Sequence, residues 1–221
     1  MREEFRAELY EVGRQLVSMA EAVRTAMSTA TTALLSADKE GAERVIARDA
    51  QINEIFHSVE DKVLRILAQQ APVASDLRMV ITALHIGTDL ERMGDLAEHV
   101  AKSAVRRYPA VAVPAELAGT IGQMANVADR IAGKVTLVLA SRDIDRAAEL
   151  EHDDDAMDEL ERSLYARILS PNWSYGVEAA VDTALLARFY ERYADHAVNA
   201  GQHIIYLVTG ETPGSPEPTE Q

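Results

Sequence analysis

Residues 89–99 read DLERMGDLAEH, and residues 190–199 read YERYADHAVN. In the first stretch Glu91, Asp95 and His99 stand at every fourth position. A helix turns by about 100° per residue, so this spacing stacks three possible metal ligands along one helix face. The Glu-x-x-x-Asp spacing occurs five times in this acidic chain, but only the second stretch repeats it in matching context. We therefore expect a repeated helical unit.

The composition favours helices over sheets. The chain has 221 residues, of which 48% are hydrophobic and only 5% aromatic, and alanine is abundant. Small side chains of this kind are typical of closely packed helices. Cysteine is absent from the sequence, which excludes disulfides and thiolate metal sites. A bound metal would therefore be held by oxygen atoms and imidazole.

The charge and the apolar runs narrow the classes of partner. The formal net charge is −14, from 36 acidic and 22 basic residues. This charge argues against nucleic-acid binding and against direct adhesion to anionic lipid, because both need a basic surface. The first residues lack the apolar core of a signal peptide, and no apolar run reaches the roughly 18 residues of a membrane span. We expect a soluble, cytoplasmic protein that meets membranes only through its partners.

The apolar periodicity predicts helices throughout the chain. Apolar residues recur in steps of three and four, which is the pattern of amphipathic helices. Asp38 and Asp143 are expected to cap helices, Pro72 to end one, and Gly210 to stop the last. Pro114 is expected in the first turn of a helix. The predicted helices cover about 3–35, 39–69, 75–107, 114–140, 144–169 and 175–209.

The two halves align in register. An offset of 105 places Asp38 on Asp143 and Asp49 on Asp154, and an offset of 100 then places the third helix on the sixth. Short connections make neighbouring helices antiparallel. The predicted fold is all-α, with two tandem antiparallel three-helix bundles related by an internal repeat. We assign residues 1–108 and 114–210 to the bundles and residues 211–221 to a disordered tail.

The hairpin between the second and third helices predicts which acidic residues meet. Asp49 lies 23 residues before Pro72, and Asp95 lies 23 residues after it. Asn53 and Glu91 lie 19 residues before and after the same proline. Equal distances from a helical turn mean equal heights along the bundle. These four side chains are therefore expected to face one another.

The second hairpin gives a looser match. With a turn near Trp173, Asp154 lies 19 residues before it and Glu191 lies 18 after it. Asp158 lies 15 residues before the turn, and Asp195 follows Glu191 by one helical turn. This count allows a slip of one turn between the two helices.

Converging carboxylates repel one another unless a cation binds. We therefore hypothesise two metal sites, one per repeat, with oxygen ligands that suit magnesium, calcium, manganese or iron. The alternative is a solvated acidic face on which Arg92 and Arg192 form surface ion pairs worth under about 1 kcal/mol. His99 is more typical of a surface or interface than of a ligand, because Asn199 takes its place in the second repeat. His196 points to a different helix face and is left out of the site.

Catalytic motifs are sparse. Residues 149–152 read ELEH, which contains one Glu-x-x-His spacing, whereas di-iron carboxylate bundles need two such motifs and two further glutamates. The sequence has no phosphate-binding glycine loop and no nucleophile elbow. We expect no enzymatic activity. The alternative is a carboxylate-bridged metalloenzyme, a di-metal oxidase or hydrolase on a helical bundle.

A family resemblance covers about residues 1–209. Residues 72–80 read PVASDLRMV and residues 88–95 read TDLERMGD, and together with residues 191–199 they resemble the PhoU family of phosphate-specific transport system accessory proteins. The resemblance implies two three-helix bundles with pseudo-twofold symmetry and metal binding by the Glu/Asp-x-x-x-Asp motifs, with iron clusters in some members. His99 stands where the family usually has asparagine. The implied metal ligands are Asp49, Asn53, Glu91, Asp95, Asp154, Asp158, Glu191 and Asp195.

The resemblance also implies a role and partners. The expected metals are iron, manganese, magnesium or zinc, as divalent or trivalent ions. The expected function is negative regulation of phosphate uptake and of phosphate-starvation signalling. As an adaptor, the protein would link the ATPase of a phosphate ABC transporter to a phosphate-sensing histidine kinase, and it would form a homodimer. Long helix faces suit such docking.

Overall fold

The computed structural model describes residues 2–211, which fold into six helices and no strand. The all-α prediction is therefore confirmed for this part of the chain. The predicted disordered tail lies outside the described residues, apart from Glu211. The helices are α1 (Arg2–Ser36), α2 (Lys39–Gln70), α3 (Ser75–Arg107), α4 (Ala118–Ser141), α5 (Ile144–Ile168) and α6 (Gly176–Thr209).

Local sequence signals set most of the helix ends. The Asp38 side chain accepts a hydrogen bond from the Gly41 amide at 2.9 Å, and Asp143 accepts one from the Arg146 amide at 3.1 Å. Each cap of this kind stabilises a helix by about 1 kcal/mol. Gly210 ends α6 with a positive φ of 80°, a conformation that glycine adopts without strain. All three expectations are confirmed.

The start of α4 differs from the prediction. Pro114 does not lie in its first turn, because the helix begins at Ala118. The Leu117 amide instead donates to the Pro114 carbonyl oxygen at 2.9 Å and closes a turn before the helix. Val113 and Leu117 are both buried. Because these two side chains are buried in the core, the residues between them form a turn and not the first helical turn that the periodicity predicted.

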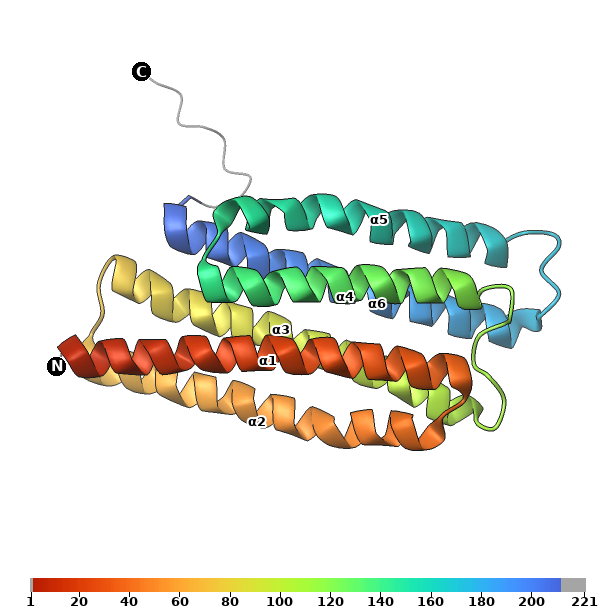
Figure 1. The fold of residues 1–221 in the computed structure, drawn as a ribbon, viewed down its shortest axis with the longest axis horizontal. Helices are drawn as coiled ribbons and strands as arrows, with labels where there is room; N and C mark the ends of the chain where they lie inside the picture. The colour runs from red at the N-terminus through yellow and green to blue at the C-terminus, as the bar shows by residue number, and fades with distance from the viewer. Residues whose placement is uncertain (1, 212–221) are drawn as a thin grey trace, which may run out of the picture.

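The helices form two layers (Figure 1). One layer is a row in which α2 packs on α3, α3 on α6, and α6 on α5. In the other layer α1 lies over α2 and α3, α4 lies over α5 and α6, and α1 also contacts α4. The second half of the chain thus repeats the packing of the first half. No helix in the described part of the chain is long and apolar enough to cross a membrane.

One hydrophobic core runs through both halves. Met19 and Met124, which the repeat relates, are both fully buried. The Tyr190 hydroxyl of α6 lies 2.5 Å from the Thr31 hydroxyl of α1, inside that core. The halves are therefore repeats in sequence and packing, and they share a single interior. The separate extents of 1–108 and 114–210 stay predictions.

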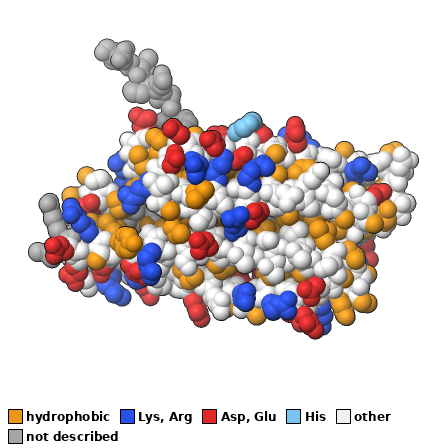
Figure 2. All heavy atoms as spheres, viewed as in Figure 1, with side chains coloured by type: hydrophobic (Ala, Val, Ile, Leu, Met, Phe, Trp, Pro, Cys, Tyr) orange, Lys and Arg blue, Asp and Glu red, His pale blue; other side chains and the backbone are white. Residues whose placement is uncertain are grey.

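Equivalent positions of the repeat meet where α1 crosses α4. Arg24 and Asp129 are 105 residues apart, which is the repeat offset. The Arg24 guanidinium donates two hydrogen bonds to the Asp129 carboxylate, at 2.6 and 2.8 Å. This bidentate pair holds the pKa of the Asp129 carboxyl below its usual range. Figure 2 shows this side of the molecule, where basic and acidic side chains are interspersed among apolar ones.

Candidate metal centres

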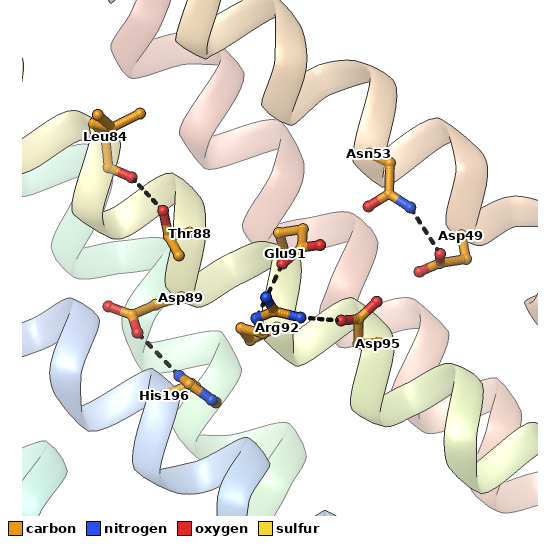
Figure 3. A network of polar contacts seen from close by, with 9 residues as sticks. All are labelled: Asp49, Asn53, Leu84, Thr88, Asp89, Glu91, Arg92, Asp95 and His196. Atoms are coloured by element: carbon orange, nitrogen blue, oxygen red, sulfur yellow. Dashed lines mark hydrogen bonds and ion pairs between the residues drawn. The ribbon is translucent and has the colours of Figure 1, made fainter.

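The first acidic cluster lies between α2 and α3. Figure 3 shows Asp49 and Asn53 on α2, and Glu91 and Asp95 on neighbouring turns of α3. Gly94 allows the two helices to approach here. A Cβ atom at that position would lie 3.2 Å from the Ile52 Cγ2 atom and 3.4 Å from the Asp49 Oδ1 atom. The missing side chain leaves the space into which the Asp49 carboxylate projects.

Part of this cluster is braced by local hydrogen bonds. The Asn53 amide donates to the Asp49 Oδ2 atom at 2.9 Å. The Arg92 guanidinium donates to the Asp95 Oδ2 atom at 2.8 Å and lies 3.5 Å from a Glu91 oxygen (Figure 3). The Asp49 Oδ1 and Asn53 Oδ1 atoms are buried and have no hydrogen-bond partner within residues 2–211. Two buried acceptor oxygens are therefore free to receive a ligand.

The pKa directions show that the acids of the two helices interact. Burial raises the pKa of Asp49, and the charges of Glu98 and Asp95 raise it further. Burial also raises the pKa of Glu91, with contributions from Asp95 and Asp49. The hairpin count thus placed Asp49 near Asp95 and Glu91 correctly, whereas the meeting of Asn53 with Glu91 stays a prediction. It missed Glu98, which follows Asp95 at the helical spacing of three and could have been found from it.

The second cluster lies between α5 and α6. Burial and the charges of Asp195 and Asp158 raise the pKa of Asp154 to about 6. Burial and the charge of Asp195 raise the pKa of Glu191 to about 7, although Arg188 pairs with Glu191 at 2.5 Å. The Asp154 Oδ1 and Glu191 Oε2 atoms are buried and find no hydrogen-bond partner in the part of the chain that the structure describes. Asp158 is the exposed member of the cluster.

The slip of one turn that the second hairpin allowed is present. Asp154 interacts with Asp195 rather than with Glu191, as Asp49 interacts with Asp95 in the first repeat. Glu161, on the next turn of α5, also contributes to the raised pKa of Glu191. Sequence reasoning missed Glu161. It lies three residues after Asp158, but the first repeat has Phe56 at the equivalent position, so the repeat gave no signal.

The residues of the run HDDD at 152–155 lie in different surroundings. Asp153 forms ion pairs with Lys134 at 2.6 Å and with Arg130 at 3.5 Å, both on α4. His152 pairs with Asp155 in an exposed contact at 3.3 Å. Asp154 is thus the residue of this run that faces the cluster.

Four of the six histidines, His85, His99, His196 and His203, lie at the seam between α3 and α6. The His99 ring stacks on Phe189 of α6, with 5.1 Å between ring centroids. The His196 Nδ1 atom lies 3.0 Å from the Asp89 Oδ1 atom, on the side of α3 that faces α6 (Figure 3). Asp89 also lies 3.5 Å from the His203 Nε2 atom. Asp89 was not singled out in the sequence, because counting along one hairpin says nothing about contacts between the halves.

The chemistry of both clusters fits a hard cation, since every unpartnered atom in them is an amide or carboxylate oxygen. The side chains as placed do not form a closed ligand set. Within residues 2–211, no group of three or more histidine, aspartate or glutamate side chains is arranged so that it could hold a metal ion. Ion binding would therefore require side-chain rotation, and the eight ligands named above stay predictions.

Comparison with known proteins identifies the family to which the chain is similar. The model of the PhoU domain matches it twice, over residues 16–104 and 121–204. A protein of Mycobacterium tuberculosis, phosphate-specific transport system accessory protein PhoU homolog 2, is 42% identical over 96% of this chain and all of its own length. The homolog 1 protein of the same species is 42% identical over 98% of each chain.

Solved structures agree with this placement. The crystal structure of the phosphate transport system regulatory protein PhoU from Streptococcus pneumoniae gives a TM-score of 0.85 at 28% identity, covering 96% of this chain and all of that one. The crystal structure of PhoU from Pseudomonas aeruginosa gives 0.83 at 28% identity, covering 94% of this chain and all of that one. The expected fold of two repeats is thereby confirmed. The chain belongs to the PhoU family.

Proposed function

We propose that this protein is an accessory protein of phosphate transport that negatively regulates phosphate uptake and phosphate-starvation signalling. In this proposal it is a cytoplasmic adaptor that links the ATPase of a phosphate ABC transporter to a phosphate-sensing histidine kinase. The names of relatives that match this chain over nearly its whole length support the transport role. The row of four helices offers long faces on which two partners can dock. Homodimerisation is part of the same proposal.

One observation carries the metal-binding part of the proposal. Both repeats place buried or half-buried carboxylates at equivalent positions, and each cluster holds buried oxygen atoms that have no hydrogen-bond partner among the described residues. An ion held by Asp49, Asn53, Glu91 and Asp95 would join α2 to α3. A second ion, held by the matching four residues of α5 and α6, would join that pair. A bound cation supplies positive charge that offsets the repulsion among these carboxylates.

An adaptor accounts for the structure better than an enzyme. The cavity of about 770 Å³ between α1, α3 and α4 is lined by residues such as Phe5, Tyr10, Met79 and Leu139, and it shares no residue with either acidic cluster. A metalloenzyme would need an open coordination position beside a substrate cavity. We therefore propose the regulatory role rather than that of a metalloenzyme.

Deletion of the gene tests this function. Expression of a phosphate-starvation reporter should rise in phosphate-rich medium when the gene is lost, and the wild-type gene should restore repression. Any paralogue must be deleted as well, because Mycobacterium tuberculosis has both a homolog 1 and a homolog 2. Complementation with both clusters neutralised, by Asp→Asn and Glu→Gln substitutions, separates metal binding from the adaptor role. Unchanged reporter expression in the strain without either gene would contradict the proposal.

A further inference from the structure

Large apolar side chains stand exposed at equivalent positions of the two repeats. At the α2–α3 hairpin, Leu64, Leu77 and Ile81 are 61%, 40% and 37% exposed. At the α5–α6 hairpin, Leu169, Val177 and Val181 are 82%, 81% and 52% exposed. The repeat offsets of 105 and 100 superpose the members of the two trios one on one. We call the first trio the α2–α3 tip patch and the second the α5–α6 tip patch.

The patches persist where the surrounding surface has changed. Between the repeats, exposed His57 corresponds to Arg162, and exposed Thr88 corresponds to Arg188. Charge and size differ within each of these pairs, whereas all six patch positions carry leucine, isoleucine or valine. Single exposed apolar residues need no explanation, but a trio that recurs at equivalent positions does.

Each patch shares its helix faces with an acidic cluster. On α3, Leu77 and Ile81 lie within about 80° of Glu91 around the helix axis, at 100° per residue. On α2, Leu64 lies within about 20° of Asn53 by the same count. The second repeat has the same spacings. One face of the row α2–α3–α6–α5 therefore carries a patch near each end and the acidic clusters between them.

The two patches lie far apart. The α2–α3 and α5–α6 hairpins are at opposite ends of the molecule (Figure 1). Contacts such as those of Asp89 with His196 and of His99 with Phe189 place the crossing of α3 and α6 near Gly94 and Ala194. Each patch is about 15 residues from that crossing, so a rise of about 1.5 Å per residue separates the patches by roughly 45 Å. No single short segment can cover both.

We propose that this face docks a two-fold symmetric protein, with one identical apolar segment of each partner subunit on each tip patch. The inference rests on the proposed adaptor role and adds to it the docking face and the symmetry of the partner. A pseudo-twofold axis relates the two patches of this chain. In a homodimeric partner a true twofold axis relates two identical segments, so each segment can contact one patch in the same way. Three aliphatic side chains form only a small contact, so both ends must engage to give useful affinity.

Charge complementarity selects such a partner over a second copy of this chain. In the metal-free protein, the basic side chains between the patches offset only part of the acidic charge; they are Arg92, Lys102, Arg162, Arg188 and Arg192. A second copy would bring its own acidic clusters against these, and like charges across an interface disfavour association. The partner surface between its two apolar segments is therefore basic. The carboxylates of the two clusters are Asp49, Glu91, Asp95, Glu98, Asp154, Asp158, Glu161, Glu191 and Asp195.

Matched pairs of substitutions test the proposal. The variants are Leu77→Ser with Ile81→Ser at one end, Val177→Ser with Val181→Ser at the other, and all four together. Leu137→Ser is the control, because Leu137 is 51% exposed, within the range of the four substituted residues, but lies on α4 in the other layer. The probes are the purified transporter ATPase and the cytoplasmic part of the kinase, immobilised in turn, with the full chain as analyte. Circular dichroism and melting temperature confirm that each variant is folded.

For one of the two probes, each single-end variant should lose affinity by about 100-fold or more, and the two losses should agree within about threefold. The variant with all four substitutions should not bind that probe, and Leu137→Ser should bind it as the wild type does. A loss of affinity in only one of the two single-end variants would contradict a two-fold symmetric partner. If the variant with all four substitutions bound both probes as the wild type does, this face would not be the docking face. A change in the sedimentation of the free protein would assign the patches to self-association instead. Failure here with repression intact in the reporter strain would leave the adaptor role standing.

Discussion

The two acidic clusters occupy the same place on the same scaffold but carry different charge. The first contains an amide, Asn53, where the second contains Asp158. Glu98 of the first cluster has Val198 as its equivalent, and Glu161 of the second has Phe56 as its equivalent, so the first holds four carboxylates and the second holds five. Arg92 contacts two carboxylates in the first cluster, whereas Arg188 contacts only Glu191 in the second. A repeated backbone thus fixes where acids gather, and individual substitutions decide how strongly they repel. A cation should relieve more repulsion in the second cluster.

The largest expected effect is that of metal on stability. After chelation and re-addition of manganese or iron, the wild type should unfold at a higher temperature, since a ligand at about 100 times its Kd adds about 2.7 kcal/mol per site. Asp154→Asn with Glu191→Gln and Asp195→Asn should remove more of this gain than Asp49→Asn with Glu91→Gln and Asp95→Asn. Scanning fluorimetry measures the shift.

The matched controls for this comparison are Glu54→Gln and Glu159→Gln. Both glutamates are exposed, the repeat offset relates them, and each adjoins a cluster residue in sequence. Neither substitution should change the metal-dependent shift. The two-site hypothesis fails if no metal raises the unfolding temperature and elemental analysis finds none in the purified protein.

The pH dependence of the metal-free protein is the next largest effect. The pKa of Glu191 is about 7 in the folded state, above its ordinary value of 4.5, so the folded protein binds the proton more tightly than the unfolded chain does. Stability from this group is full below about pH 4.5 and is lost as the pH rises through 7. Glu191→Gln should therefore stabilise the protein at pH 8 by about 1–2 kcal/mol after allowance for solvent screening, and little at pH 4.

Urea unfolding at pH 4 and pH 8 with chelator present measures this difference. Glu91→Gln is the equivalent change in the first cluster and should give a smaller gain, because that cluster holds fewer carboxylates. Equal gains from the two substitutions would show that the clusters do not differ in repulsion. Parallel curves for wild type and Glu191→Gln would contradict the raised pKa.

The smallest expected effects come from the arginines. Arg188 lowers the pKa of Glu191, and Arg92 lowers that of Glu91. Arg188→Ala and Arg92→Ala should therefore raise these pKa values, although each costs less than about 1 kcal/mol because both guanidinium groups are largely exposed. Carbon-13 NMR titration of the glutamate carboxyls follows each group. An unchanged titration would mean that these ion pairs do not persist in solution.

Local signals made most of the fold predictable. Periodicity, the aspartate caps and the terminal glycine depend on residues within one or two turns, and they placed five of the six helices closely. The predicted start of α4 was wrong because the burial of Val113 and Leu117 depends on the rest of the core, which local signals do not report. The packing of the halves into one layered body likewise depends on contacts between residues about 100 positions apart.

The sites were predictable where symmetry or hairpin geometry constrained them. Equal spacing from Pro72 placed Asp49 with Asp95, because one short turn fixes the relative height of two helices. Glu98 and Glu161 were not predicted as members of the clusters. Each is present in one repeat only, so a search for repeated residues discards it. The Asp89 contact with His196 depends on where α3 crosses α6, which no count along a single hairpin gives.

The ion pair between Arg24 and Asp129 also limits which halves can associate. The repeat relates the two residues, and they meet where α1 crosses α4. If the halves were identical, that crossing would set arginine against arginine or aspartate against aspartate. This one change of charge favours association of the two different halves over association of two copies of one half. Split at the α3–α4 connection, the chain should therefore reassemble as a heterodimer, with its two parts complementary and no longer interchangeable.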